Sequence, residues 1–407
     1  MTQALLKRYL QDAIEKDALT KSKMAFISGP RQCGKTTLTH SLLTKLRESS
    51  HYFTWDDDEF RKLWVRNPKT IIQQLALTNE RKPLIVLDEI HKQRTWKRSL
   101  KGLYDIYKDT VSFIITGSAR LDIYRKGGDS LQGRYFHYHL HPFSLAESAT
   151  ITPPPQSKKN WFEHTHQSFP LESLLTLGGF PEPLLSGSER EAQRWRRLRR
   201  ERLIREDLRD LRSVNDLQSI ENLTLLLEDV AGSALSYESL REDLQISFAT
   251  VKDWINVLSS LYFCFLLKPY SHNIRRALHK EPKLYLYDWS AIKNSGARLE
   301  NLIACHLLKT CHAWTDFAFG NFELFYIKDK EKREVDFLIT NDGIPFALIE
   351  VKSNEREVSK SLKYYTTLLK PQYSFQIVLN AKLERKDTTI KPSIHIVEAS
   401  RFLSSLV

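Results

Sequence analysis

The first third of the chain alternates short apolar runs with longer polar stretches that have helical periodicity. The run Leu-Ile-Val-Leu at residues 84–87 is aliphatic throughout, as expected for a strand buried on both faces. Strand, helix and strand in succession predict a parallel sheet with right-handed crossovers. The predicted elements are strands at residues 24–28, 51–55, 84–87 and 112–116 and a helix at residues 36–48.

The pattern changes after a loop with three consecutive prolines near residue 153. A helical region follows to about residue 216, and then a pattern typical of a winged helix, with a capped helix at 236–244, a second helix at 248–262 and wing strands at 265–268 and 283–287. From about residue 296 a helix precedes strands at 324–327, 334–339 and 346–351. We therefore predict an α/β protein with a core at 1–147, a helical lid and linker at 148–216, a winged helix at 217–290 and an α/β domain at 291–407.

A glycine-rich loop follows the first predicted strand and fits the pattern GxxxxGK[ST] in full. Its glycines allow backbone amides to curl around phosphate groups, and the helix that follows points its positive end at the anion. Lys35 would neutralise phosphate oxygens, and the Thr36 hydroxyl would bind Mg²⁺. The residues predicted to cradle ATP are Gly29, Pro30, Arg31, Gln32, Cys33, Gly34, Lys35, Thr36 and Thr37.

An acidic pair ends the aliphatic strand at residues 84–87. Asp88 would bind Mg²⁺ through water, and Glu89 would orient or deprotonate the water that attacks the γ-phosphate. The two motifs stand in the order and context of a nucleotide hydrolase. The sequence therefore predicts an ATPase that uses ATP and Mg²⁺.

Further polar residues are candidates for sensing or catalysis. Ser118 ends the next core strand, where it would report the state of the γ-phosphate or simply cap a helix. An arginine finger would stabilise the transition state, because arginine stays charged and presents a fork of donors to phosphate. The finger candidates, each of which is alternatively an ordinary surface charge, are Arg120, Arg134 and one of Arg199, Arg200 or Arg205.

Charge and cysteine content bear on the expected partners and cellular location of the protein. Lysine and arginine number 61 against 49 acidic residues, which gives a formal net charge of +12 and favours either a polyanionic partner such as DNA or a solvated basic surface. None of the four cysteines forms a CxxC pair, and residues 1–23 are charged throughout, so we expect reduced thiols and a cytoplasmic location. The apolar run at 261–267 is far too short to span a membrane, so no membrane partner is expected.

Two basic segments are candidates for DNA contact. Residues 194–202 form a dense basic helix, which is either a nucleic-acid surface or a solvated face near a subunit junction. The predicted wing loop carries Arg275, Arg276 and Lys280, which would reach phosphates while the helix at 248–262 enters a groove. A protein-docking role for this module is the alternative.

Six motifs in fixed order give the chain a family resemblance. They are GPRQCGKTTL at 29–38, VLDEIHK at 86–92, TGSAR at 116–120, LQGRY at 131–135, PFS at 142–144 and GGFP at 178–181. Together they resemble the prokaryotic AAA+-type ATPases that carry a C-terminal DUF4143 region. The resemblance implies an AAA+ core, a winged helix and a C-terminal domain similar to PD-(D/E)xK nucleases.

A carboxylate and lysine pattern lies in the region that the resemblance assigns to this last domain. Asp336 belongs to one predicted strand, and Glu350 and Lys352 share a face of the next. Two close carboxylates bind a hard divalent cation, and a lysine beside them would steady an attacking hydroxide, which is the chemistry of metal-assisted phosphodiester cleavage. Glu334 lies on the face of Asp336 as an alternative ligand, and the resemblance adds Glu300. The alternatives are a fold retained without turnover, or solvent-facing charges.

These observations favour an ATPase whose cycle drives conformational change on DNA, by translocation, remodelling or branch processing, with a metal-dependent nuclease site as an open hypothesis. The arrangement allows a homo-oligomer. A second interpretation is a nucleotide-controlled switch in signalling or assembly, whose C-terminal domain binds partners without cutting. A third is an ATP-bound scaffold.

Overall fold

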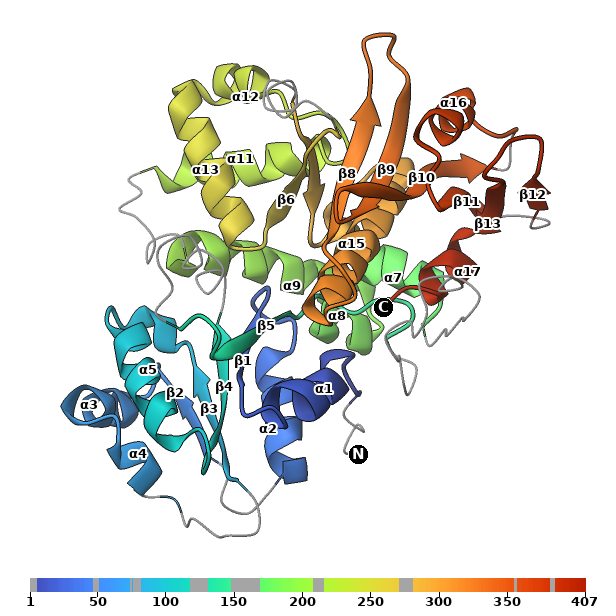
Figure 1. Cartoon of the computed structure of the whole chain (residues 1–407). Coiled ribbons are helices and arrows are strands. Elements are labelled where there is room, and N and C mark those ends of the chain that lie inside the picture. Colours follow the sequence, from blue (N-terminus) through green and yellow to red (C-terminus); the bar gives the residue numbers. More distant parts are fainter. Residues whose placement is uncertain are drawn as a thin grey trace. The chain divides into compact units, whose positions relative to one another are not determined.

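A computed structural model gives the fold (Figure 1). It describes residues 6–46, 51–73, 75, 82–117, 131–147, 169–207, 216–270, 281–354, 357–380 and 385–407. The chain divides into two compact units, residues 1–142 and 143–407. Among the described residues, no helix combines the length and the apolar character that crossing a membrane requires.

The first unit is built on a five-stranded parallel sheet with the order β2-β3-β4-β1-β5. Its strand β1 lies between β4 and β5, with Ala25 opposite both Ile114 and Phe136. The strands are β1 (Met24–Ser28), β2 (His51–Thr54), β3 (Leu84–Asp88), β4 (Ser112–Gly117) and β5 (Tyr135–His139). Four of the five follow the predicted apolar runs, and the sheet with its helices fits the core of a P-loop ATPase.

Strand β5 did not emerge from the apolar pattern. Its sequence Tyr-Phe-His-Tyr-His mixes aromatic and imidazole side chains, and only Tyr138 among them is fully buried. The strand belongs to the sheet because it pairs along its whole length with β1. This edge position explains the weak hydrophobic signal.

Helices cover both faces of this sheet. One face packs Phe26, Leu87 and Phe113 against aromatic residues of the helices, including Trp64 and Trp96, in one hydrophobic core. The helical segments of the unit are α1 (Leu10–Ala13), η1 (Ile14–Leu19), α2 (Lys35–Leu46), α3 (Asp58–Arg66), α4 (Thr70–Gln73), η2 (Ile90–Lys92) and α5 (Trp96–Tyr107). Helix α2 begins at Lys35, so the phosphate-binding motif forms the turn between β1 and α2.

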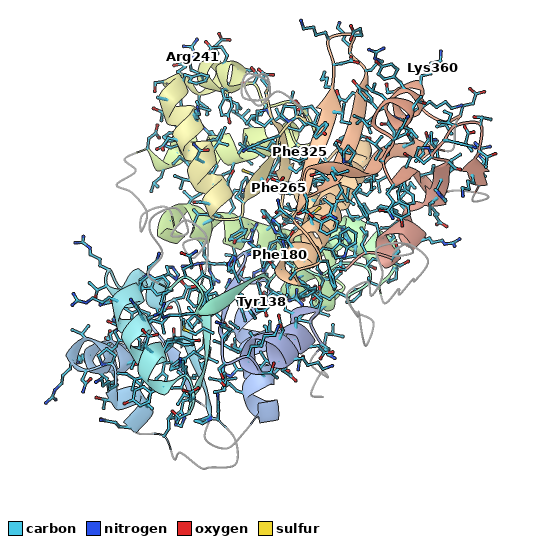
Figure 2. The ribbon with its side chains drawn as sticks, in the orientation of Figure 1. Tyr138, Phe180, Arg241, Phe265, Phe325 and Lys360 are labelled. Atoms are coloured by element: carbon cyan, nitrogen blue, oxygen red, sulfur yellow. The ribbon has the colours of Figure 1, made fainter. Side chains whose placement is uncertain are left out.

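The second unit begins with helices and a two-stranded sheet. Figure 2 labels Phe180, at the start of α8, and Phe265, in β6. Phe180 is fully buried, and Phe265 stacks on Tyr285 of β7 with ring centroids 5.5 Å apart. The elements are α7 (Leu171–Leu177), α8 (Pro181–Ser186), α9 (Glu189–Arg202), η5 (Leu203–Asp207), α11 (Leu217–Asp229), α12 (Tyr237–Leu244), α13 (Phe248–Ser260), β6 (Cys264–Leu267) and β7 (Lys283–Leu286).

Serine caps begin two of these helices, as the sequence predicts. Ser236 Oγ accepts a hydrogen bond from Ser239 N at 3.2 Å, and Ser247 Oγ accepts one from Thr250 N at 3.1 Å. Each cap satisfies an amide that the first helical turn leaves without a partner. Three helices followed by an antiparallel strand pair is the order expected of a winged helix, and the assignment to that fold stays a prediction.

A long helix and a six-stranded mixed sheet complete the second unit, with strand order β12-β13-β11-β10-β9-β8. Helix α16 packs on one face through Leu362 and Tyr365, which meet Leu338 and Leu348 of the sheet. The elements are η6 (Trp289–Ala291), α15 (Ser295–Asp316), β8 (Phe322–Lys328), β9 (Glu334–Asn341), β10 (Ile344–Asn354), α16 (Lys360–Leu369), β11 (Tyr373–Asn380), β12 (Arg385–Asp387), β13 (Ile394–Glu398) and α17 (Ala399–Ser404).

Candidate functional site

The loop between β1 and α2 is curled around its own lysine. Lys35 Nζ donates hydrogen bonds to the carbonyl oxygens of Gly29 at 2.9 Å and Pro30 at 2.8 Å, and the side chain is buried. Gln32 and Gly34 have φ angles of 62° and 97°, in the left-handed region that a tight phosphate-binding turn uses. The loop therefore holds its curvature with the ammonium group in the bend.

Neighbouring segments brace this loop. Arg8, which is buried, donates to Cys33 O at 2.6 Å and to His141 O at 2.5 Å. Leu140 N donates to Ser28 O at 2.8 Å, and a Cβ at Gly29 would clash with Leu140 O. Glycine is therefore required at position 29 by close approach of the chain that leaves β5. Sequence reasoning missed Arg8, because no local motif marks an arginine so far from the loop in sequence.

Asp88 lies at the carboxyl end of β3, two strands from β1. Its Oδ2 accepts a hydrogen bond from Tyr52 Oη at 2.5 Å, and its Oδ1 accepts one from Thr116 Oγ1. Burial and the hydrogen bond to Asp88 raise the pKa of Tyr52 well above its usual value, and Tyr52 also interacts with Thr36. Tyr52 thus interacts with both of the residues that the sequence predicts as Mg²⁺ ligands.

Glu89 is held in a left-handed conformation, with φ 55° and ψ 19°. Its amide donates to Thr116 O at 3.0 Å, and His91 Nε2 lies 3.4 Å from its Oε2. Burial raises the pKa of the Glu89 carboxyl, and the positive charge of Lys35 partly opposes this shift. Non-glycine residues in this region of φ and ψ often occur at functional sites. A carboxylate with a raised pKa is a stronger base, as the role predicted for Glu89 requires.

The sensor and finger candidates separate into three groups. Ser118 and Arg120 lie outside the described residues. Arg134 forms a paired contact with Asp105 of α5, with Nε–Oδ1 at 2.7 Å and Nη2–Oδ2 at 3.1 Å. The candidates Arg199, Arg200 and Arg205 belong to α9 and η5 of the second unit.

Helix α9 uses one row of its arginines to pack within the second unit. Arg196 Nη1 donates to Ser290 Oγ at 2.8 Å, Arg200 forms an ion pair with Glu228, and Arg199 stacks 4.3 Å from the centre of the Phe180 ring. A second row, Arg190, Arg194 and Arg197, is exposed. The predicted wing contacts Arg275, Arg276 and Lys280 lie outside the described residues.

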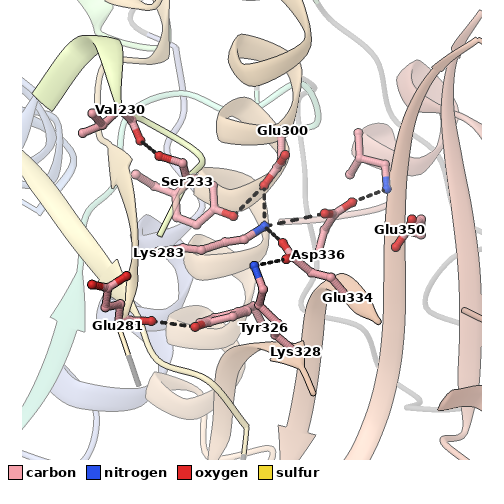
Figure 3. Close-up of polar contacts among 12 residues, drawn as sticks. Val230, Ser233, Glu281, Lys283, Glu300, Tyr326, Lys328, Glu334, Asp336 and Glu350 are labelled. Atoms are coloured by element: carbon pink, nitrogen blue, oxygen red, sulfur yellow. Dashed lines mark hydrogen bonds and ion pairs between the residues drawn. The ribbon is translucent and has the colours of Figure 1, made fainter. Parts of the chain in front are cut away.

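A cluster of carboxylates in the second unit surrounds one buried lysine (Figure 3). Lys283 Nζ of β7 lies 2.6 Å from Glu334 Oε1, 3.3 Å from Glu300 Oε1 and 3.7 Å from Asp336 Oδ1. Glu300 Oε1 also accepts a hydrogen bond from Tyr285 Oη at 2.7 Å. The structure thus brings Glu300, Glu334 and Asp336 together, as the nuclease hypothesis expects, around a lysine that the sequence did not single out.

The remaining pair of the nuclease hypothesis lies on β10. Lys352 Nζ forms an ion pair with Glu350 Oε1 at 2.6 Å, and Val351 N between them donates to Asp336 Oδ2 at 2.8 Å. Burial, and then the charge of Asp336, raise the pKa of Glu350 to about 7. The same two causes raise the pKa of Glu300 to about 7. Within the ranges that the structure describes, no group of three or more histidine, cysteine and acidic side chains is arranged to hold a metal ion.

Comparisons with known proteins place these two regions. A model described as an AAA domain matches residues 21–149, and two models described as domains of unknown function, DUF8612 and DUF4143, match residues 169–316 and 295–400. An uncharacterized protein of Methanocaldococcus jannaschii is 24% identical over 404 residues, covering 88% of this chain and 81% of the relative. An uncharacterized protein of Mycobacterium tuberculosis is 21% identical over 354 residues, covering 85% and 74%.

Solved structures with partial likeness include a Walker-type ATPase of Pyrococcus abyssi, with a TM-score of 0.42 at 15% identity over 73% of this chain and 97% of that one. The Orc1 protein of Aeropyrum pernix in complex with DNA gives 0.34 at 12% identity, over 74% and 95%. The matched AAA domain contains the phosphate loop and the acidic pair, and the DUF4143 match contains the strands of the carboxylate cluster. The chain therefore contains an AAA domain at residues 21–149, with the sequence motifs of an ATPase, and a C-terminal DUF4143 region at residues 295–400.

Proposed function

We propose that the first unit binds ATP with Mg²⁺ between the loop at Gly29–Thr36 and the acidic pair, and hydrolyses it there by attack of water on the γ-phosphate. The supporting observation is that two motifs far apart in the sequence, Lys35 with Thr36 and Asp88 with Glu89, lie at the carboxyl ends of β1 and β3 in one parallel sheet. Ligands of open parallel sheets bind at this edge.

Each side chain has a distinct task. Lys35 leaves the carbonyls of Gly29 and Pro30 to meet phosphate oxygens, and the loop amides bind the oxygens around it. Thr36 and Asp88 would hold Mg²⁺, which neutralises charge on the phosphates when bound. Glu89 accepts the proton of the attacking water, and its raised pKa suits this task.

The decisive assay is steady-state ATP hydrolysis by the full chain. We expect Lys35→Ala to lose nucleotide binding and turnover, and Glu89→Gln to keep binding but lose turnover by roughly two to four orders of magnitude. Lys62→Ala, which changes an exposed lysine of α3, serves as the matched control. Wild-type turnover should fall as pH drops through the pKa of Glu89, because the protonated carboxyl cannot accept a proton. Full turnover by Lys35→Ala would rule out this site.

We further propose that the hydrolysis cycle drives conformational change on DNA. Two features support this: the net charge of +12 and the exposed row Arg190, Arg194 and Arg197 of α9. If these arginines bind phosphates, the affinity for duplex DNA should fall with salt. The triple alanine variant should then have a salt slope shallower by about 0.9 for each phosphate that is no longer neutralised. An unchanged slope would remove this surface from the proposal.

A second candidate is a nucleotide-controlled switch whose C-terminal region binds partners without cutting, and the lysine at the centre of the carboxylate cluster favours it. Incubation of wild type and Asp336→Ala with single-stranded, duplex and branched DNA in Mg²⁺ or Mn²⁺ separates the candidates. Cleavage that disappears with Asp336→Ala supports the nuclease hypothesis for Glu300, Asp336, Glu350 and Lys352. Absence of cleavage with nucleotide-dependent assembly supports the switch.

A further inference from the structure

Lys283 reaches the carboxylate cluster from outside the six-stranded sheet. It begins β7, whose partner strand β6 continues beside β8: Tyr270 N donates to Tyr326 O at 2.7 Å, and Tyr326 N donates to Lys268 O at 3.1 Å. The two-stranded sheet is therefore joined by backbone hydrogen bonds to the edge of the C-terminal sheet. This junction fixes the strand that carries Lys283 beside the acidic residues.

The ammonium group is buried and enclosed by acidic partners. Lys283 is 4% exposed, and its Nζ meets one oxygen each of Glu300, Glu334 and Asp336. These carboxylates come from two different elements, α15 and the first and third positions of β9. Burial alone would favour the neutral amine, but Glu300, Asp336 and Glu334 raise the pKa of Lys283 above its usual value, so the group is a cation.

A fourth carboxylate lies beside the cluster. Glu350 is 4% exposed, and its Oε2 is buried without a hydrogen-bond partner among the described residues. Carboxylate oxygens in such number are the ligands that hard divalent cations prefer. The position that such a cation would take between Glu300, Glu334 and Asp336 is the position of the Lys283 ammonium.

We propose that Lys283 is a built-in cation that closes this carboxylate cluster, so that the lysine and a divalent cation exclude each other. The cluster then acts in the wild-type chain as an ion-pair junction between the two-stranded sheet and the C-terminal sheet. The residues present do not accommodate a second divalent metal while Lys283 is in place. This inference is independent of ATP hydrolysis in the first unit.

The test is a titration of the full chain with Mn²⁺ in the absence of nucleotide. Calorimetry measures Mn²⁺ binding, and thermal unfolding measures the change in Tm. Wild type should show neither saturable binding at the cluster nor a rise in Tm. Lys283→Met should bind about one Mn²⁺ saturably, at concentrations at which wild type shows no binding, because unscreened carboxylates now face the vacated position. Mn²⁺ should also raise its Tm, and adding Asp336→Asn should abolish both effects.

Two variants control for charge and for folding. Lys283→Arg keeps a cation and should bind no Mn²⁺, whereas Lys328→Met removes an exposed partner of Glu334 and should behave as wild type. If Lys283→Met does not fold, the double variant Lys283→Met/Glu334→Gln carries one negative charge less and takes its place. The proposal is overturned if wild type binds Mn²⁺ in a manner that Asp336→Asn abolishes. It is equally overturned if the folded Lys283 variant binds none.

Discussion

Lys309 and Glu147 form a deeply buried ion pair, and replacing Lys309 by methionine should strongly destabilise the second unit. Lys309 Nζ, on α15, donates to Glu147 Oε2 and to Ser144 Oγ, the latter at 2.9 Å. The two charged side chains are 2% and 0% exposed. Because both side chains are shielded from water, methionine would remove the ammonium that Lys309 sets against the buried Glu147 carboxylate.

The magnitude follows from the burial. Breaking a buried pair by removing one partner costs about 3–5 kcal/mol, whereas replacing both partners by apolar groups is often neutral or stabilising. We therefore expect Lys309→Met to lower the free energy of unfolding of the second unit by about 3–5 kcal/mol. The double variant Lys309→Met/Glu147→Leu should recover most of this loss.

Urea unfolding followed by circular dichroism measures both effects. Lys363→Met is the matched control, because its ion pair with Asp387 at 3.2 Å is partly exposed and should contribute at most about 1 kcal/mol. A loss below about 1 kcal/mol for Lys309→Met would refute the reasoning, since it would mean that the carboxylate finds water or protonates at little cost. A double variant as unstable as the single one would refute it too.

Two further predictions concern the same region. Burial lowers the pKa of His306 to about 3, so below about pH 6.5 the unfolded chain binds a proton at this histidine that the folded chain does not. The contribution of His306 to the free energy of unfolding is therefore complete above that pH and falls by about 1.4 kcal/mol per pH unit below it. Urea titrations from pH 7 to 5 should show this slope in wild type and not in His306→Gln. A Cβ at Gly179 would lie 2.6 Å from both Phe143 O and the Trp289 ring, so Gly179→Ala should lower Tm and cost about 1–3 kcal/mol of stability. A Cβ at Gly102 meets nothing within 4 Å, so the control variant Gly102→Ala should not destabilise the protein. Equal Tm values for the two variants would contradict this account.

Short sequence motifs were enough to predict a candidate nucleotide site, whereas the long-range contacts of that site could not be predicted. The phosphate loop and the acidic pair at Asp88 and Glu89 are short motifs attached to apolar strands, so their chemistry is written in consecutive residues. Arg8 and Tyr52 act on that site across the fold, and nothing near them in sequence marks a role. The fold therefore joins partners that lie in separate, unrelated stretches of sequence.

The C-terminal region shows the same limit. Because side chains alternate between the two faces of a strand, the sequence predicted that Asp336 and Glu334 share a face, and the structure brings both to the cluster. Lys283 was predicted only as the first residue of a wing strand, because its role depends on how β7 meets α15 and β9. The strands β11 to β13 and helices α16 and α17 were not predicted, since no motif after residue 351 organises that stretch of sequence.

Lys35 resting on the carbonyls of Gly29 and Pro30 has a consequence for how a nucleotide arrives. The Lys35 ammonium already occupies the bend of the loop. If ATP binds here as proposed, its phosphate would replace the two carbonyl contacts of Lys35, and the loop would not have to become ordered first. Little conformational entropy is then lost on docking, and most of the free energy of capture is retained as affinity. Product release would likewise leave no unpaired ammonium, because Lys35 can again donate hydrogen bonds to the carbonyl oxygens of Gly29 and Pro30.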